Sequence, residues 1–269
     1  MNYQVPVVNM VAMVVSLALS VGVAVAGGIV GKVKGKAKLS SMFLGCAGFL
    51  VSAMILEQIF HVIILTVTGN GLKENIWLYA IYGGLCAGVF EETGRYVVMK
   101  FAMKKTLDKR NALMYGVGHG GIEAILIGGL TSISNIATAV TINNGMLESI
   151  LASLDEATRA TVQQQCAQLW ELPAYMFTLV GIERLLAFTL QVCLSYLVYR
   201  AVKYGNIRSY LLAILIHMLV DTGAVLLAKV TSVVVVLAVL AVADVAMVFF
   251  TTGWYKKEQK VKVSMEQKM

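Results

Sequence analysis

Long blocks of apolar residues, separated by short polar segments, dominate the chain. A membrane-spanning helix needs about 20 largely apolar residues, and several blocks reach that length. Apolar and polar residues do not alternate within the blocks as they would on the half-buried surface of a soluble protein. The pattern therefore predicts an all-α polytopic transmembrane helix bundle of about seven spans, at residues 8–30, 40–66, 76–102, 112–134, 175–199, 209–228 and 231–252.

Composition supports the membrane assignment. Of the 269 residues, 58% are hydrophobic and 14% are charged, whereas a soluble domain carries about 25% charged residues. We expect residues 1–269 to form a single integral membrane domain of a multi-pass protein in the cell membrane, in a bacterium the cytoplasmic membrane. The four cysteines have no metal-ligand spacing and predict neither a disulfide framework nor a cysteine zinc site.

The net charge of +7 arises from basic loops, not from a nucleic-acid-binding face. Sixteen of the 22 Lys and Arg residues lie in four segments, namely 31–39, 103–111, 200–208 and the tail after residue 252. Loops on the other side carry only Lys73, Arg159 and Lys229. The positive-inside rule then predicts an outer N-terminus and a cytoplasmic C-terminus, in agreement with an odd number of spans.

Two further segments need a separate interpretation. Ala24-Val25-Ala26 resembles a signal-peptidase site, but no basic region precedes the apolar run, so we expect an uncleaved span. The long outer loop, about 135–174, contains a capping box from Ser153 to Glu156 that predicts a helix ending before Pro173. A membrane-surface helix and a lid over a site both fit this loop.

Ionisable residues within the spans are the main functional signal. Each costs about 2.5–3.5 kcal/mol to insert at mid-bilayer, so such residues mark functional sites by default. At about 1.5 Å per residue, one group falls at a common depth between the cytoplasmic face and the midplane: Glu91, Glu92, Arg95, His119, Glu123, His217 and Asp221. A second group lies nearer the outer face and is expected to form structural pairs: Glu57 with His61, and Glu183 with Arg184. Asp244 remains unassigned.

The spacing of the deeper group indicates hydrolytic chemistry. His119 and Glu123 are four residues apart and share a helix face, as do His217 and Asp221. A water held between a carboxylate and an imidazole is a competent nucleophile, with the carboxylate as general base. A second imidazole could donate a hydrogen bond to the oxyanion of a tetrahedral intermediate.

Other functions fit the same residues. Glu92, His119 and His217 could hold Zn²⁺ with one open position, although no HExxH motif is present. A proton-coupled transporter also uses intramembrane acids and histidines, but the chain shows no inverted repeat. A third alternative is a non-catalytic assembly or immunity factor.

The chain resembles the YhfC-type membrane peptidases in three segments, which occur in the order FEETGRYVVMKF, YGVGHGGIEAILIGG and IHMLVDTGA. These peptidases are related to the CAAX-protease/bacteriocin-processing (Abi) superfamily and to the PrsW-like proteases. The resemblance implies a glutamate-dependent intramembrane endopeptidase with Glu91, Glu92, Arg95, His119, Glu123, His217 and Asp221 as site residues. The superfamily has been described both as metal-dependent and as metal-free, and the resemblance leaves this open.

The EETGR segment has two residues between the glutamate pair and Arg95, where the CAAX-protease pattern has three. This spacing is closer to the PrsW-like pattern, which usually carries lysine at that position. Specificity for prenylated proteins is therefore not expected. The expected partners are membrane lipids and a membrane-embedded or lipid-anchored peptide substrate, with no nucleic acid.

These observations lead to one leading hypothesis, the hydrolysis of peptide bonds in a cavity reached from the cytoplasmic side. Glu91 or Glu92 is the general base on water and His119 is its partner. His217 with Asp221 stabilises the oxyanion. No cofactor is favoured, and Zn²⁺ is the alternative.

Overall fold

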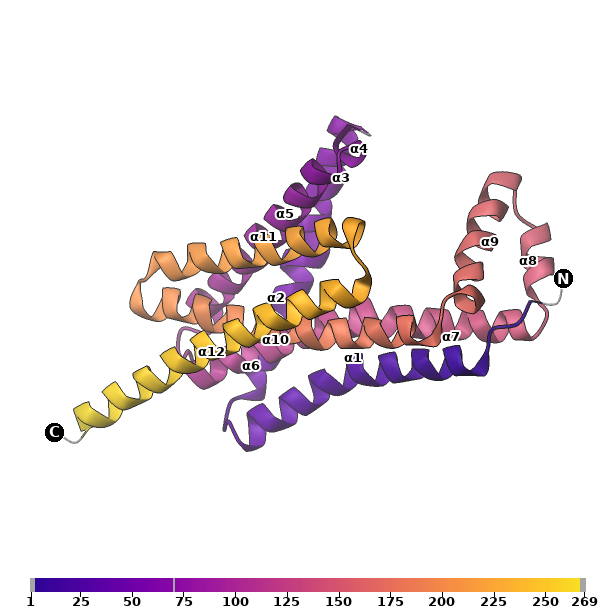
Figure 1. The fold of residues 1–269 in the computed structure, drawn as a ribbon. Coiled ribbons are helices and arrows are strands. Elements are labelled where there is room, and N and C mark those ends of the chain that lie inside the picture. The colour runs from indigo at the N-terminus through magenta and orange to yellow at the C-terminus, as the bar shows by residue number, and fades with distance from the viewer. Residues whose placement is uncertain (1–2, 70, 267–269) are drawn as a thin grey trace. The chain divides into compact units, whose positions relative to one another are not determined.

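The computed structural model describes residues 3–69 and 71–266, which fold into helices joined by short turns (Figure 1). The predicted all-α class is thus confirmed. In chain order the helices are α1 (Val7–Val33), α2 (Leu39–Val51), η1 (Ser52–Glu57), α3 (Gln58–Thr68), α4 (Gly71–Glu74), α5 (Ile76–Val97), η2 (Val98–Ala102), α6 (Lys109–Ala124), η3 (Ile125–Gly129), α7 (Leu130–Asn143), α8 (Leu147–Ala152), α9 (Glu156–Glu171), α10 (Ala174–Tyr204), α11 (Ile207–Val230) and α12 (Val233–Glu266).

Six continuous helices in the described residues are long and apolar enough to cross a membrane. They are Val7–Val33, Leu39–Thr68, Lys109–Asn143, Ala174–Tyr204, Ile207–Val230 and Val233–Gln259. The predicted span 76–102 is also helical, as α5 and η2, but it is not among the six. Its Glu91, Glu92 and Arg95 lower the mean hydropathy of this segment. The polytopic architecture is therefore confirmed, and the orientation of the termini stays a prediction.

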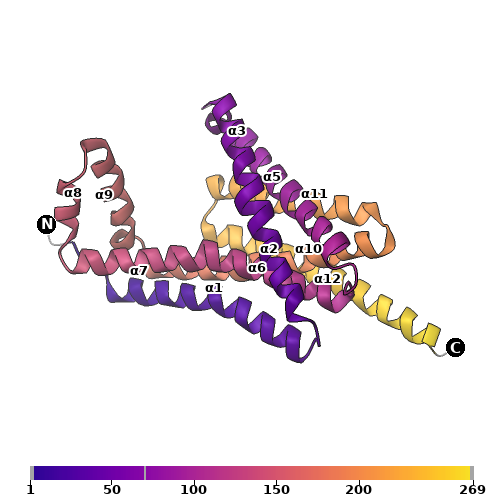
Figure 2. The same cartoon turned by 180° about the vertical axis from the view of Figure 1, so that it is seen from behind.

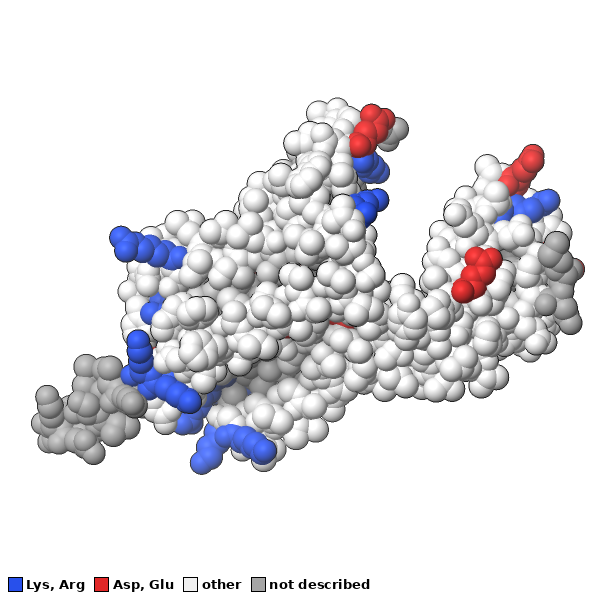
Figure 3. Space-filling model, in the orientation of Figure 1, with Lys and Arg blue, Asp and Glu red and all other residues white. Residues whose placement is uncertain are grey.

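The surface of these helices is strongly apolar. Large hydrophobic side chains are widely exposed, for example Phe43 at 68% and Phe249 at 75%. On the face shown in Figure 3, most of the surface is neither acidic nor basic. Soluble monomers rarely expose apolar area on this scale, so the surface is that of a protein solvated by lipid chains.

Three of the long helices contain a π-helical segment that was not predicted from the sequence. These segments are η1, η2 and η3, and each continues an α-helix without a break in the chain. A π-helical turn is rare and often occurs at functional sites. Here η1 ends at Glu57, η2 begins three residues after Arg95, and η3 begins two residues after Glu123.

The described chain forms two compact units. The first comprises residues 3–23 and Glu123–Leu185, and the second comprises Ala24–Ile122 and residues 186–266. In the second unit, α5 packs along α11 and also against α2 and η1 (Figures 1 and 2). Its apolar core includes Met99, Tyr115 and Tyr196.

Side-chain amides fasten the N-terminal segment within the first unit. The Val5 N–H donates to Asn143 Oδ1 at 2.7 Å, and Asn143 Nδ2 donates to the Val5 carbonyl at 3.1 Å. Asn9 Nδ2 donates to the carbonyls of Leu169 and Leu172 at 2.9 and 3.0 Å. Because carbonyls at the end of a helix lack partners within the helix, Asn9 supplies a C-terminal cap for α9.

The predicted outer-loop helix is present, but its N-cap differs from the prediction. The capping-box interpretation placed Ser153 at the N-cap; instead Ser153 follows α8 and its hydroxyl donates to the Ile150 carbonyl. Asp155 caps α9, because its Oδ1 accepts from the Thr158 N–H at 3.0 Å. The expected span 112–134 also continues as helix to Asn143, so the loop begins later than expected.

We expect the start of α9 to lose protection at low pH. The hydrogen bonds from Thr158 hold the pKa of Asp155 below its ordinary value. A depressed pKa means that the cap stabilises α9 above the unfolded-state pKa and that this stabilisation disappears as the pH falls through the folded-state value. Hydrogen exchange of the Thr158 amide should therefore speed up at acidic pH relative to its intrinsic rate. In Asp155→Ala the amide should already be unprotected at neutral pH, and an unchanged exchange profile would contradict this cap.

Candidate active site

Glycines on α5 bring the acidic residues of this helix against α11. A Cβ at Gly84 would lie 2.6 Å from the Met218 carbonyl oxygen, and one at Gly88 would lie 2.8 Å from the Ile214 carbonyl oxygen. Neither distance is tolerated by a real side chain, so only glycine permits this approach of the two backbones. The next turn of α5 carries Glu91 and Glu92.

Glu92 lies between a histidine and an arginine. Its Oε1 is 2.9 Å from His217 Nδ1, and its Oε2 is 3.3 Å from Arg95 Nε. The side chains of Glu92 and Arg95 are completely buried. The contact with the carboxylate orients the imidazole of His217 so that Nε2 points away from Glu92.

Arg95 is further bound by α10. Its Nη1 donates to the Gln191 carbonyl at 2.7 Å and to Ser195 Oγ at 2.8 Å, while Nη2 donates to Gln191 Oε1 at 2.5 Å. Neither Gln191 nor Ser195 was predicted as a site residue. The signal in the sequence was weak, namely two uncharged polar residues four apart in the span that also carries Glu183 and Arg184.

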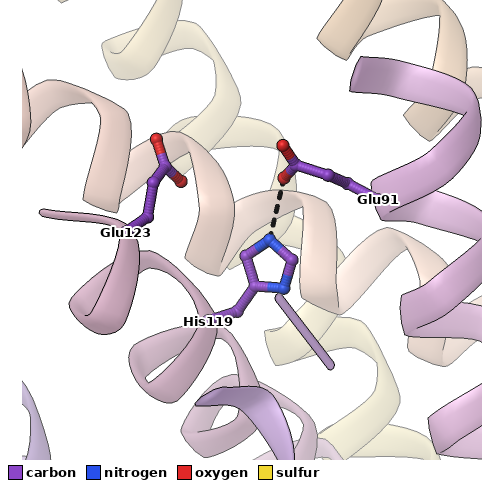
Figure 4. Close-up of side chains that lie close together, drawn as sticks. All are labelled: Glu91, His119 and Glu123. Carbon is purple, nitrogen blue, oxygen red and sulfur yellow. Dashed lines mark hydrogen bonds and ion pairs between the residues drawn. The ribbon is translucent and has the colours of Figure 1, made fainter. Parts of the chain in front are cut away.

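Glu91 faces both buried histidines. His119 Nε2 lies 2.8 Å from Glu91 Oε2 (Figure 4), and His217 Nε2 lies 4.0 Å from the same oxygen. Gln191 Nε2 also donates to this oxygen at 3.0 Å. On its other side, His217 Nε2 is 3.6 Å from Asp221 Oδ2, and the Asp221 side chain is 42% exposed. The predicted acid–imidazole cluster on α5, α6 and α11 is thus formed, and Asp221 is its most accessible member.

The glycine run around His119 sets the position of α6. A Cβ at Gly116 or Gly120 would lie within 3 Å of α10 atoms, at Ser195 and Gln191 respectively. A Cβ at Gly118 would overlap the Met42 carbonyl oxygen on α2. These glycines let α6 approach both neighbours closely enough for His119 to reach Glu91. Neighbouring helices therefore fill the space that these glycines leave beside His119.

Gly118→Ala should be clearly destabilising. The added methyl would meet backbone atoms of α2, which cannot rotate away, and overpacking of this kind costs about 1–3 kcal/mol. We expect a lower midpoint of thermal unfolding in detergent micelles. Gly83→Ala on α5 is the matched control, because nothing lies within 4 Å of the position that a Cβ would take there. Equal midpoints for the two variants would contradict the packing account.

The separation of the acids into a deeper and an outer group is not kept in three dimensions. Glu183 contacts Arg184 as expected, but Arg184 Nη1 also lies 3.2 Å from Glu123 Oε1, a residue assigned to the deeper group.

Glu57 likewise joins the two groups. Its Oε1 is 3.2 Å from His61 Nε2, as predicted, and His61 Nδ1 is 2.7 Å from the Tyr82 hydroxyl. Glu57 also interacts electrostatically with Glu91, His217 and Asp221. The depths estimated along straight helices placed Glu57 in the outer group. They therefore gave too small a number of acids near the site histidines.

One group of described residues is suited by proximity to hold a metal ion. Glu91, His119 and Glu123 each offer one ligand atom, and these atoms lie within 4.8 Å of one another (Figure 4). Glu123 follows His119 by one turn of the same helix, α6, which fixes the spacing of these two. The zinc set predicted from the sequence was Glu92, His119 and His217, which shares only His119 with this group. Glu92 contacts His217 and Arg95 instead, and that set stays a prediction.

Comparison with known proteins decides the family. A family model described as "YhfC intramembrane metalloprotease" matches residues 15–242. The chain belongs to the YhfC family. A relative in Bacillus subtilis (strain 168), "Uncharacterized membrane protein YhfC", is 43% identical over 193 residues, which cover 71% of this chain and 74% of the relative. No solved structure matches.

The YhfC match contains every residue of the predicted site, from Glu91 to Asp221. It confirms the family that the three sequence segments indicated, together with a multi-pass membrane protein and, from the family description, a membrane protease. The relation of YhfC proteins to the CAAX-protease and PrsW-like groups stays a resemblance.

Proposed function

We propose that this YhfC-family chain is an intramembrane endopeptidase that hydrolyses peptide bonds in membrane-embedded or juxtamembrane segments of its substrates. The observation that carries the proposal is the convergence of two imidazoles from different helices on one buried carboxylate oxygen, Glu91 Oε2. A purely structural helix contact needs only one such pair. The family description supports the same class of reaction.

We further propose that the enzyme is metal-dependent, in place of the metal-free form favoured from the sequence. Glu91 Oε2, His119 Nε2 and His217 Nε2 are ligand atoms of the kinds that Zn²⁺ prefers. His217 Nδ1 contacts the Glu92 carboxylate at 2.9 Å, and zinc-ligating histidines typically donate their second ring N–H to such a partner. Glu91 and His119, which belong to the group that could hold a metal, are therefore proposed as zinc ligands, and His217, whose Nε2 lies 4.0 Å from Glu91 Oε2, is proposed as the third.

When bound, zinc in a three-ligand site supplies Lewis acidity that activates water and polarises a carbonyl. The remaining residues have separate roles in this proposal. Glu92 fixes the ring of His217, and Arg95 balances the buried charge of Glu92. Asp221 carries the proton from water to the leaving amine, since it lies beside His217 Nε2 and its side chain is the most exposed of the cluster.

This assignment changes two roles that were predicted from sequence. Glu91 or Glu92 was expected to be the general base, and Asp221 was expected to help His217 stabilise the oxyanion. Both oxygens of Glu92 already have partners in His217 and Arg95. Glu91 then serves as a ligand, which leaves Asp221 as the carboxylate that water and substrate can reach.

The proposal is tested by searching for substrates in membranes. Cells that express the wild-type protein, Glu91→Gln or Glu74→Gln are compared by mass spectrometry of new peptide termini in membrane proteins. Glu74 is exposed on α4, outside the cluster, and controls for the substitution itself. Termini present with wild type and Glu74→Gln but absent with Glu91→Gln are the expected result. Identical termini in all three strains would contradict a protease that uses this cluster.

A further inference from the structure

We propose that Gln191 is a positioning residue that holds the Glu91 carboxylate in place for metal binding. The inference rests on the proposed zinc site and concerns a residue that neither the sequence motifs nor the family description identifies. Gln191 lies on α10 and is 3% exposed. Its side chain connects the guanidinium of Arg95 to the carboxylate of Glu91.

The orientation of the Gln191 amide follows from its neighbours. Arg95 has only N–H donors, so the atom that faces Nη2 at 2.5 Å must be the amide oxygen. The amide nitrogen then faces Glu91 Oε2 at 3.0 Å and donates to it. A flipped amide would place donor against donor at Arg95 and two acceptors against each other at Glu91. Arg95 therefore sets the direction of the hydrogen bond that Glu91 receives.

This hydrogen bond differs from the one between Glu91 and His119. A histidine that ligates a metal must offer a lone pair, so metal binding displaces the proton that His119 Nε2 shares with Glu91 Oε2. Metal binding does not displace the amide proton of Gln191, so Gln191 can donate to Glu91 both with and without the metal. It is thus the contact able to keep Glu91 in one orientation when the His119–Glu91 bond is replaced.

The backbone around Gln191 is fixed as well. A Cβ at Gly120 would lie 2.9 Å from Gln191 Cβ, so α6 and α10 are in close contact at this level. The Gln191 carbonyl also accepts from Arg95 Nη1 at 2.7 Å. One residue of α10 is therefore bound to α5 through its main chain and its side chain, which leaves the amide little freedom to turn.

The test measures zinc affinity by competition with a chelator, on the full-length protein purified in detergent. Gln191→Met keeps the length of the side chain and removes both hydrogen bonds. We expect zinc to bind about 10–100-fold more weakly, as for the loss of other groups that support metal ligands. Gln191→Asn keeps the amide but is one methylene too short to reach both partners, so it should also weaken binding even if the methionine variant folds poorly.

Two controls separate positioning of Glu91 from general packing. Ser195→Ala removes an acceptor of Arg95 without touching Glu91 and should bind zinc as wild type does. Gln164→Met makes a matched substitution on the exposed face of α9 and should also leave the affinity unchanged.

Three outcomes would count against the inference. Wild-type affinity in both Gln191 variants would overturn it, and so would equal weakening in Gln191→Met and Ser195→Ala. A wild-type protein that binds no zinc would overturn the metal-dependent form of the proposed function and this inference with it.

Discussion

His119→Gln is expected to lose both bound zinc and proteolysis. The His119 ring is completely buried, and its Nε2 lies 2.8 Å from Glu91 Oε2. A glutamine amide is a poor zinc ligand, so metal content should fall from about one ion per chain to nearly none. Removal of a catalytic group typically costs a factor of about 10²–10⁴ in rate. Metal analysis of purified protein and the rate of appearance of the substrate termini measure the two losses.

His61, the histidine outside the proposed zinc site, offers a matched control. In the described part of the chain, His61 contacts Glu57 and Tyr82 rather than Glu91 or His119. His61→Gln should therefore retain about one zinc per chain. Zinc retained in His119→Gln would eliminate His119 as a ligand. Cleavage retained in a zinc-free His119→Gln would instead favour the metal-free mechanism.

Arg95→Met is expected to cause the largest loss of stability. Arg95 and Glu92 are both completely buried, so the substitution leaves a carboxylate without its cation in a region that water does not reach. Breaking a buried ion pair from one side typically costs about 3–5 kcal/mol. Thermal or denaturant unfolding in detergent micelles should show a correspondingly lower stability than in the wild type.

The double variant Arg95→Met/Glu92→Gln tests whether the unpaired carboxylate of Glu92 causes the loss of stability in Arg95→Met. Removing the second charge relieves the uncompensated carboxylate, so stability should recover in part, and the coupling between the two substitutions measures the interaction. Metal binding should not recover, since His217 loses its ionic partner. A double variant that is less stable than Arg95→Met would indicate that Arg95 acts mainly through its bonds to α10.

The fold class could be predicted from the sequence because helices surrounded by lipid require long blocks of apolar residues. The apolar blocks, the charged residues inside them and their helical spacing were enough to predict that Glu91, His119, His217 and Asp221 lie near one another. The histidine–carboxylate pairing across helices then followed from equal depth. The partners of the two glutamates could not be predicted, because adjacent glutamates point in different directions and depth alone does not say which one faces which histidine.

The contribution of α10 could not have been predicted in the same way. Gln191 and Ser195 are uncharged, so they raise no insertion cost that would distinguish them from other polar residues in a span. Their importance comes from facing Arg95, which depends on the rotation of α10 about its own axis. The Arg184–Glu123 pair has the same origin, since charge and depth together did not place these two residues in contact.

The π-helical segments have a consequence for aligning relatives of this chain. A π-helical turn holds about one residue more than an α-helical turn, so η1 can lose a single residue and become ordinary α-helix while both flanking segments keep their facing. The same deletion elsewhere between Leu39 and Thr68 would rotate one part of the helix by about 100° against the other. One-residue gaps in alignments of family members should therefore occur mainly within residues 52–57. An alignment that places such a gap elsewhere would match Glu57 with a residue that is not equivalent to it.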